Sequence, residues 1–148
     1  MNQHNHDIIS ITVMPDIRML PVIQLITQEI GDQLGLEKEK LLKTTLAVEE
    51  VFGYCLKMVR KEKDPSRITM TYRRQDASLH IITEHQGPQG VLERHFLPGR
   101  EESFPLTSFE AIGLKIAHDI LDDLRYVRLY DGRSRYTATI KLPPEFPS

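Results

Sequence analysis

The sequence predicts an α+β protein: a two-layer α/β sandwich in which three helices lie on one face of a mixed sheet. Segments with the two-residue apolar period of strands and segments with the helical period follow one another in the order β-α-α-β-β-α-β-β. Neighbouring strand segments are separated by short turns, which is typical of hairpins. The 148 residues suit one domain, with its core over about residues 8–142.

The first half of the chain contains one strand and two helices. Residues 8–13 have the β-branched composition of a strand. Apolar residues then recur at helical spacing over 19–34, and Gly35 is a natural helix stop. A longer helix is predicted over 37–61, because one apolar stripe continues through it until the break at 63–66.

The second half contains two hairpins separated by a loop and a helix. In the predicted helix, Ile112, Ile116 and Ile120 are expected on the buried side. Asp131 and Gly132 are a strong turn signal between the last two strands. We expect strands over 67–73 and 78–84, a loop over 86–108, a helix over 109–122, and strands over 126–130 and 135–142.

Composition excludes several classes of partner. The net charge is −2, so there is no electrostatic case for nucleic acid or an anionic membrane. No apolar run approaches the roughly 20 residues that span a bilayer. The single Cys55 cannot form an intramolecular disulfide, which fits a reducing compartment. We therefore expect a cytoplasmic protein that binds neither nucleic acid nor membrane.

Two glycine-containing turns are candidate binding elements. The stretch EHQGPQG follows a strand, and Gly87 there permits a close approach of the backbone to a ligand or to the protein itself. Gly113 lies near the start of a helix, where unpaired backbone N–H groups favour a phosphate. Its alternative role is to permit tight packing of that helix. Glu49, Glu50 and His85 have no recognised metal-ligand spacing, so no metal site is predicted.

Four stretches together resemble one family: TTLAVEEVFGY (44–54), IITEHQGPQG (81–90), AIGLKIAHDI (111–120) and LRYVRLYDGRSRYTATIKL (124–142). They are similar to anti-sigma-factor serine kinases, which belong to the superfamily of histidine kinases, gyrase B and MutL. The resemblance extends over about residues 8–142, with every element in the family's order. It implies the histidine-kinase-like ATPase fold, with ATP or ADP as ligand and Mg²⁺ bound only together with ATP.

The resemblance assigns site residues and also exposes departures from the family. Glu50 matches the glutamate that orients or deprotonates the attacking group. Tyr54 stands where the family has the asparagine that binds magnesium. His85 replaces the aspartate of the D-x-G-x-G box, which accepts the adenine amino group, and Gly87 is the surviving glycine. Because adjacent strand residues point to opposite faces, Glu84 is not expected to substitute for that aspartate.

Three further positions follow from the same resemblance. Gly113 and Leu114 match the G-L-x-I end of the second glycine box, whose upstream glycines are missing here. Thr137 matches a threonine near the adenine. The apolar residues of segment 90–108, in the place of the family's ATP lid, predict that it closes over the cleft, and a plain loop is the alternative.

Two functions remain open at this point. The first is a regulatory protein that acts by protein–protein interaction in partner switching, with a degenerate and weak ATP site. The second is an active ATP-dependent protein serine/threonine kinase that phosphorylates an antagonist protein. The expected partners are a sigma factor, an antagonist or a second copy of the chain as a homodimer. Tyr54 and His85 distinguish the two functions, since both replacements are expected where ATP handling has been abandoned.

Overall fold

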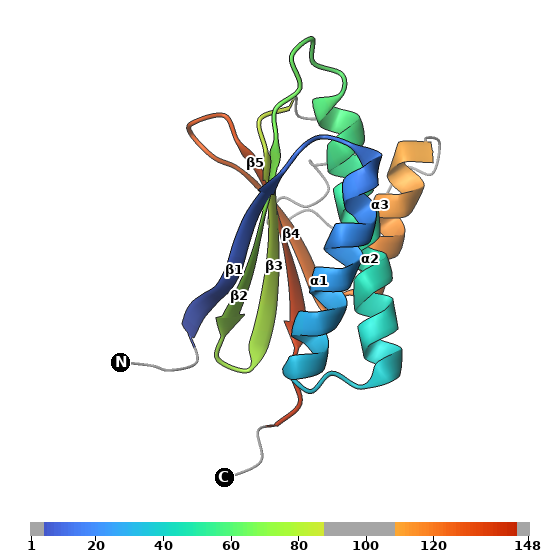
Figure 1. Ribbon diagram of the computed structural model, residues 1–148, viewed down its shortest axis with the longest axis vertical. Coiled ribbons are helices and arrows are strands. Elements are labelled where there is room, and N and C mark those ends of the chain that lie inside the picture. Colours follow the sequence, from blue (N-terminus) through green and yellow to red (C-terminus); the bar gives the residue numbers. More distant parts are fainter. Residues whose placement is uncertain (1–4, 88–108, 145–148) are drawn as a thin grey trace.

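The structure, a computed structural model, describes residues 5–87 and 109–144, with side chains from residue 112 onward in the second range. Figure 1 shows the helices and strands in the predicted order. They are β1 (Asn5–Val13), a 3-10 turn (Ile17–Met19), α1 (Leu20–Gln33), α2 (Lys38–Val59), β2 (Ile68–Gln75), β3 (Ser78–His85), α3 (Phe109–Ile120), β4 (Asp123–Arg128) and β5 (Ser134–Lys141). The predicted lid, 90–108, lies outside the described residues.

In the part of the chain that the structure describes, the sheet has five strands in the order β1-β2-β3-β5-β4, and every pair is antiparallel. The prediction of a mixed sheet was therefore wrong. The helix pair α1–α2 makes two passes along the sheet between β1 and β2, so β2 returns antiparallel to β1 (Figure 1). After α3, β4 runs in the direction of β3, but β5 lies between them and β4 is at the edge. No parallel pair can then form.

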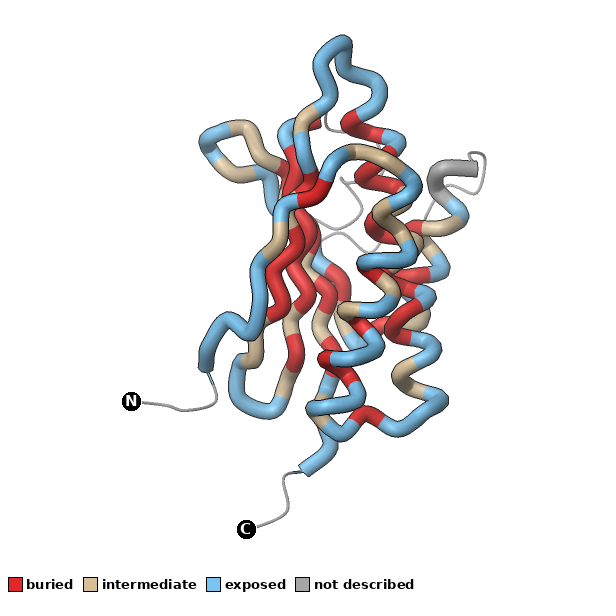
Figure 2. The backbone as a smooth tube through the Cα atoms, viewed as in Figure 1, coloured by how far each residue is buried: buried red, intermediate tan, exposed pale blue. Residues whose placement is uncertain are grey.

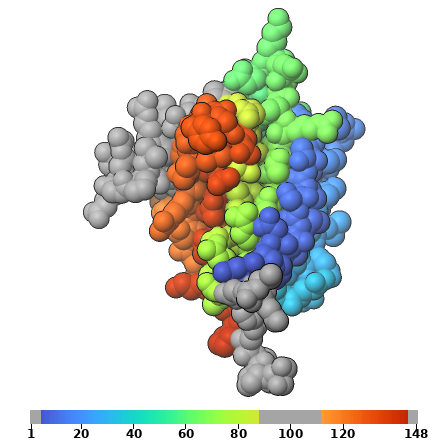
Figure 3. Space-filling view, turned by 90° about the vertical axis from the view of Figure 1, so that its left-hand side faces the viewer, coloured from blue at the N-terminus to red at the C-terminus, as the bar shows by residue number. Residues whose placement is uncertain are grey.

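All three helices cover one face of the sheet, as predicted (Figures 1 and 2). The helix α2 lies in the middle of this layer, in contact with α1 and α3. The core lies between the two layers, where side chains of alternate sheet residues are buried, among them Leu79, Ile81, Ala138 and Ile140. Figure 3 shows the opposite face of the sheet, where β1, β2, β3 and β5 reach the surface.

The helix α3 buries a different stripe from the one predicted, and of the three predicted isoleucines only Ile120 packs against the core. Ile112 and Ile116 are 41% and 39% exposed, whereas Leu114 and Ala117 are buried. Both stripes have helical spacing, so the periodicity alone does not choose between them. Leu114 and Ala117 belong to the core where α3 packs against α2, and the two isoleucines are exposed.

The edge strand β4 begins and ends earlier than predicted. Asp123 already pairs with Thr139 of β5, and the strand ends at Arg128 rather than residue 130. Residues 129–133 form the turn, because the amide of Leu129 donates a hydrogen bond to the carbonyl of Arg133. Gly132 has a φ of +92°, which confirms the predicted hairpin turn.

Candidate functional site

The carboxylate of Glu50 lies against α3 at Gly113. A β-carbon added at Gly113 would overlap Oε2 of Glu50, so the carboxylate would have to move away from its present position. Glu50 is half-buried in the middle of α2, and Gly113 is in the second turn of α3. The structure thus brings together two of the predicted site residues. It also gives Gly113 a packing role within the protein.

Tyr54 is built into an aromatic cluster. Only 3% of its surface is exposed, and its ring packs edge-on against Tyr136 of β5, with ring centroids 6.1 Å apart. His85 stacks on the same Tyr136 ring at 5.8 Å, and Tyr126 of β4 packs against it at 5.1 Å. Two predicted site residues, Tyr54 and His85, therefore meet on the ring of Tyr136.

The environment of His85 determines its protonation. Its Nδ1 accepts a hydrogen bond of 2.9 Å from the amide of Gly87. Burial, together with the guanidinium of Arg128, lowers the pKa of His85 to about 4, so the ring is neutral at pH 7. A neutral imidazole whose Nδ1 is an acceptor carries its proton on Nε2. That Nε2 is buried and has no hydrogen-bond partner among the described residues, so the ring offers only a donor beyond the turn.

The turn after β3 packs against the protein itself. A β-carbon on Gly87 would lie 3.1 Å from the backbone N and Cα of Val59, near the end of α2. Nη1 of Arg128 donates to the carbonyl of Gly87 at 3.2 Å and to Oγ of Ser134 at 3.0 Å. Gly87 thus serves a close approach between a turn and a helix, and Arg128 ties that turn to β5.

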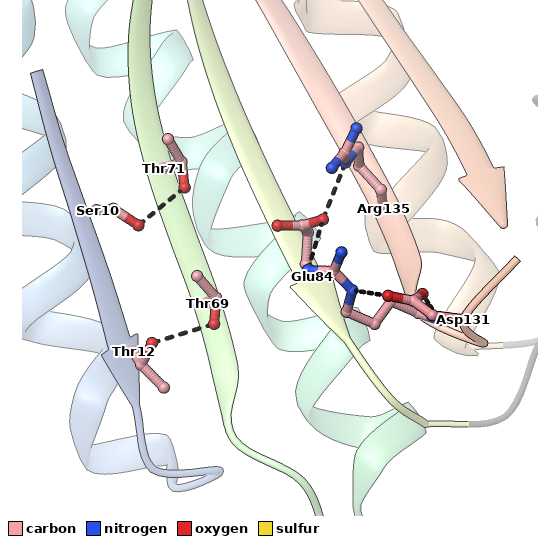
Figure 4. Close-up of polar contacts among 8 residues, drawn as sticks. Ser10, Thr12, Thr69, Thr71, Glu84, Asp131 and Arg135 are labelled. Carbon is pink, nitrogen blue, oxygen red and sulfur yellow. Dashed lines mark hydrogen bonds and ion pairs between the residues drawn. The ribbon is translucent and has the colours of Figure 1, made fainter. Parts of the chain in front are cut away.

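Glu84 and His85 point to opposite faces of the sheet, as predicted. On the open face, Glu84 accepts a hydrogen bond of 2.9 Å from Nε of Arg135, and Arg133 lies 3.5 Å away (Figure 4). Glu84 is 8% exposed and committed to these two arginines. It does not share a face with the aromatic cluster, so it cannot take the role of the missing aspartate.

The remaining predicted residues lie apart from one another. Leu114 is fully buried in the core. Thr137 pairs with Ile82 and Arg125 on the open face, across the sheet from the helices. Its neighbour Tyr136 points to the other face, where it forms the centre of the aromatic cluster. Thr137 is the residue that matches the family's threonine. The alternating burial along β5 instead places Tyr136 on the face that the helices cover.

Sequence reasoning missed Tyr136, Arg128 and Ser134. The sequence signal for Tyr136 is the two-residue period of the last strand. Arg128 carried no local signal, because its contacts join β4 to a turn 41 residues earlier in the chain.

The described residues contain no group of three or more metal-ligating side chains. Glu49 accepts a hydrogen bond from Gln24 of α1, while Glu50 faces α3, so the two neighbours lie on opposite flanks of α2. Within the same residues, no helix is long and apolar enough to cross a membrane.

The first prediction concerns pH. The pKa of His85 is lower in the folded protein than its ordinary value of 6.5, so the unfolded chain binds the proton first. The stability contributed by His85 is complete above about pH 6.5 and is lost as the pH falls toward 4. His85→Phe keeps a ring on Tyr136 and does not titrate. Between pH 7.5 and 5.5, urea unfolding should show a loss about 1 kcal/mol larger for the wild type than for His85→Phe. If the wild type and His85→Phe lost the same free energy of unfolding, the assignment of His85 as a neutral, buried ring would be contradicted.

The second prediction concerns Gly113. Alanine in a helix is ordinarily about 1 kcal/mol more favourable than glycine. In the wild type this gain should be lost, because the new methyl group displaces the carboxylate of Glu50. In a Glu50→Ala background the gain should return, which a double-mutant cycle of urea unfolding measures. Gly53→Ala is the matched control, since an added β-carbon there meets no heavy atom within 4 Å. If the effects of Gly113→Ala and Glu50→Ala on the free energy of unfolding were additive, the contact between the two residues would be refuted.

Comparisons with known proteins bear on the fold. No protein-family model matches the sequence, and no curated protein matches it significantly. The chain superposes on the solved structure of the RsbU and RsbW domains of Rv1364c from Mycobacterium tuberculosis with a TM-score of 0.61 and 14% identity, over 95% of this chain and 34% of that one. It therefore spans about a third of that chain's length. A structure of the SiaB-SiaC complex from Pseudomonas aeruginosa gives a TM-score of 0.59 and 8% identity, over 93% of this chain and 91% of that one.

At these identities the likeness concerns the fold. The TM-scores of 0.61 and 0.59 show that the chain shares its overall α+β architecture with these two structures. The chain therefore has the fold that these two solved structures share, and the fold is consistent with the resemblance seen in the sequence.

Proposed function

We propose that this protein is a regulatory module that acts through protein–protein interaction in partner switching, and that its ATP site is degenerate and weak. The observation that carries the proposal is the aromatic cluster. The two positions at which the resembling family reads adenine and binds magnesium are His85 and Tyr54, and both rings are packed on Tyr136.

The base-reading position has the wrong hydrogen-bond polarity for adenine. An adenine amino group needs an acceptor, which a carboxylate supplies. The acceptor nitrogen of His85 is already used by the amide of Gly87, and Nε2 is a donor. Losing a charged hydrogen bond to the base costs roughly 1.5–3 kcal/mol, or one to two decades in affinity.

The metal position is also changed. Magnesium requires hard oxygen ligands at short, regular distances, and it tolerates distortion poorly. Tyr54 offers a phenol on a ring that is 3% exposed and held against Tyr136. Phosphoryl transfer relies on metal-assisted charge neutralisation more than nucleotide binding does. Efficient kinase activity is therefore the property that this replacement should affect most.

A protein partner fits both the fold and the solved structures. The Pseudomonas structure is a complex of SiaB with SiaC, and the Mycobacterium structure contains an RsbW domain beside an RsbU domain. We propose a sigma factor or an antagonist protein as the partner, in the cytoplasm.

A second function, an active protein serine/threonine kinase, is favoured by one observation. The carboxylate of Glu50 is half-buried beside Gly113 of α3, next to the box that would hold phosphate in the resembling family. This location is what supports Glu50 as the catalytic base in the alternative proposal.

Calorimetric titration with ADP and ATP, each with and without magnesium, tests the proposal. We expect weak or absent binding that depends little on magnesium, because neither the base acceptor nor the metal ligand is present. Micromolar, magnesium-dependent affinity for ATP would overturn this expectation and restore the kinase.

A repair experiment tests whether Tyr54 and His85 are the replacements that weaken the ATP site. Tyr54→Asn together with His85→Asp restores one metal ligand and one base acceptor, and should raise ATP affinity measurably. Tyr54→Asn also removes a buried ring, so the variant's fold has to be verified by circular dichroism before titration. The matched control is Tyr54→Phe with His85→Phe, which preserves the packing and restores neither group. A folded repair variant that binds no better than this control would show that other departures, such as the missing glycines, matter more.

A further inference from the structure

A cavity of about 290 Å³ lies between the start of α2 and the end of α3. Thr44, which lines it, is about 15 Å from Tyr54 along the helix, so the cavity is separate from the aromatic cluster. Its inner wall is apolar and belongs to the core or packs against it, through Ile120, Leu121 and Ile140. Its rim is polar and carries charges of both signs, from Glu37, Glu39, Lys40, Lys43 and Asp122.

Most of the charges on the rim are already paired within the chain. Nζ of Lys40 lies 3.1 Å from Oδ2 of Asp122 and donates to the carbonyl of Lys141 at 3.0 Å. Nζ of Lys43 lies 3.3 Å from Oε1 of Glu39. A simple anion would face the two carboxylates of these pairs, and a simple cation would face the two ammonium groups. The rim therefore favours a ligand that carries one charge of each sign.

Polar groups of both kinds remain unused at this cavity. Thr44 is only 3% exposed, and its hydroxyl has no hydrogen-bond partner within the described residues. Glu37 has no ion-pair partner within those residues either. It stands at the N-cap position of α2, but its side chain does not cap the helix, so no side chain there accepts from the amides of the first turn. The cavity thus offers a buried hydroxyl and helix amides as donors, and one carboxylate as acceptor.

We propose that this cavity binds a zwitterionic α-amino acid with an aliphatic side chain, such as L-leucine. The carboxylate of the ligand accepts from the hydroxyl of Thr44 and from the first-turn amides of α2, where the helix dipole favours an anion. The ammonium group of the ligand donates to the carboxylate of Glu37. The aliphatic side chain packs against the apolar wall. Pockets for drug-sized ligands begin at about 300 Å³, so a cavity of 290 Å³ suits a molecule as small as an amino acid.

Titration with L-leucine and two truncated analogues tests the proposal. Amide NMR spectra of the full chain are recorded with each compound up to about 10 mM, because a ligand of this size should bind with a dissociation constant of about 1 mM or lower. Isocaproate lacks the ammonium group and isoamylamine lacks the carboxylate, so each should bind at least about tenfold more weakly than L-leucine. The shifted amides should lie within residues 37–44 and 120–122. An unchanged spectrum with L-leucine, equal binding of either analogue, or shifts centred on the aromatic cluster would overturn the proposal.

Two substitutions test the two ends of the ligand separately. Thr44→Val removes the hydroxyl and Glu37→Gln removes the charge of the carboxylate, so each should raise the dissociation constant of L-leucine about fivefold or more. Thr45→Val is the matched control for the first, because Thr45 is also buried on α2 but donates to the carbonyl of Leu41. Glu29→Gln on α1 is the control for the second. Circular dichroism verifies that each variant is folded.

Unchanged affinity for L-leucine in either Thr44→Val or Glu37→Gln, or an equal loss in its control, would refute the site. Nucleotide is absent from all of these measurements, so their outcome is independent of the proposed function.

Discussion

The sheet has one face that must be buried, and this constraint determines the geometry of the candidate site. Along β3 and β5, alternate residues face the helices, and the pairing register decides which ones. His85 lies opposite Ser134 and Thr83 lies opposite Tyr136 on the buried side. A shift of one residue would instead bury Glu84 beside Arg135, which places charges in the core at a cost of several kcal/mol. The core therefore enforces the arrangement of His85 and Tyr136.

The aromatic cluster follows from that arrangement. Tyr136 stands at its centre, with Tyr54, His85 and Tyr126 in contact with its ring. Aromatic pairs at these separations add about 0.5–1.5 kcal/mol each beyond the burial of their surface. The Nε2 of His85, which has no partner within residues 5–87 and 112–144, acts in the opposite direction, since a buried donor without a partner costs about 1–3 kcal/mol. The packing of three rings offsets that local loss.

The same packing changes what the site can do. Groups that handle a nucleotide must point into a cleft with unused hydrogen-bonding capacity. Here Gly87 approaches Val59 of the protein's own helix, and Arg128 closes the turn against Ser134. Hydrogen bonds that could serve a ligand are made within the chain. Among the described residues, the apolar side chains that remain exposed lie on outer surfaces, at β1, on the outer sides of the helices, and in β4 and the turn after it, where proteins can bind.

The sequence by itself determined the order of helices and strands, the hairpins, and the side of the sheet that the helices cover. These features follow from local periodicity and turn residues, as at Gly132. It also identified Tyr54 and His85 as departures from a known pattern. It could not choose between the two apolar stripes of α3, between Tyr136 and Thr137, or between a mixed and an antiparallel sheet. Those choices depend on which strand lies next to which, and contacts between residues far apart in the chain decide them, as between Arg128 and Gly87.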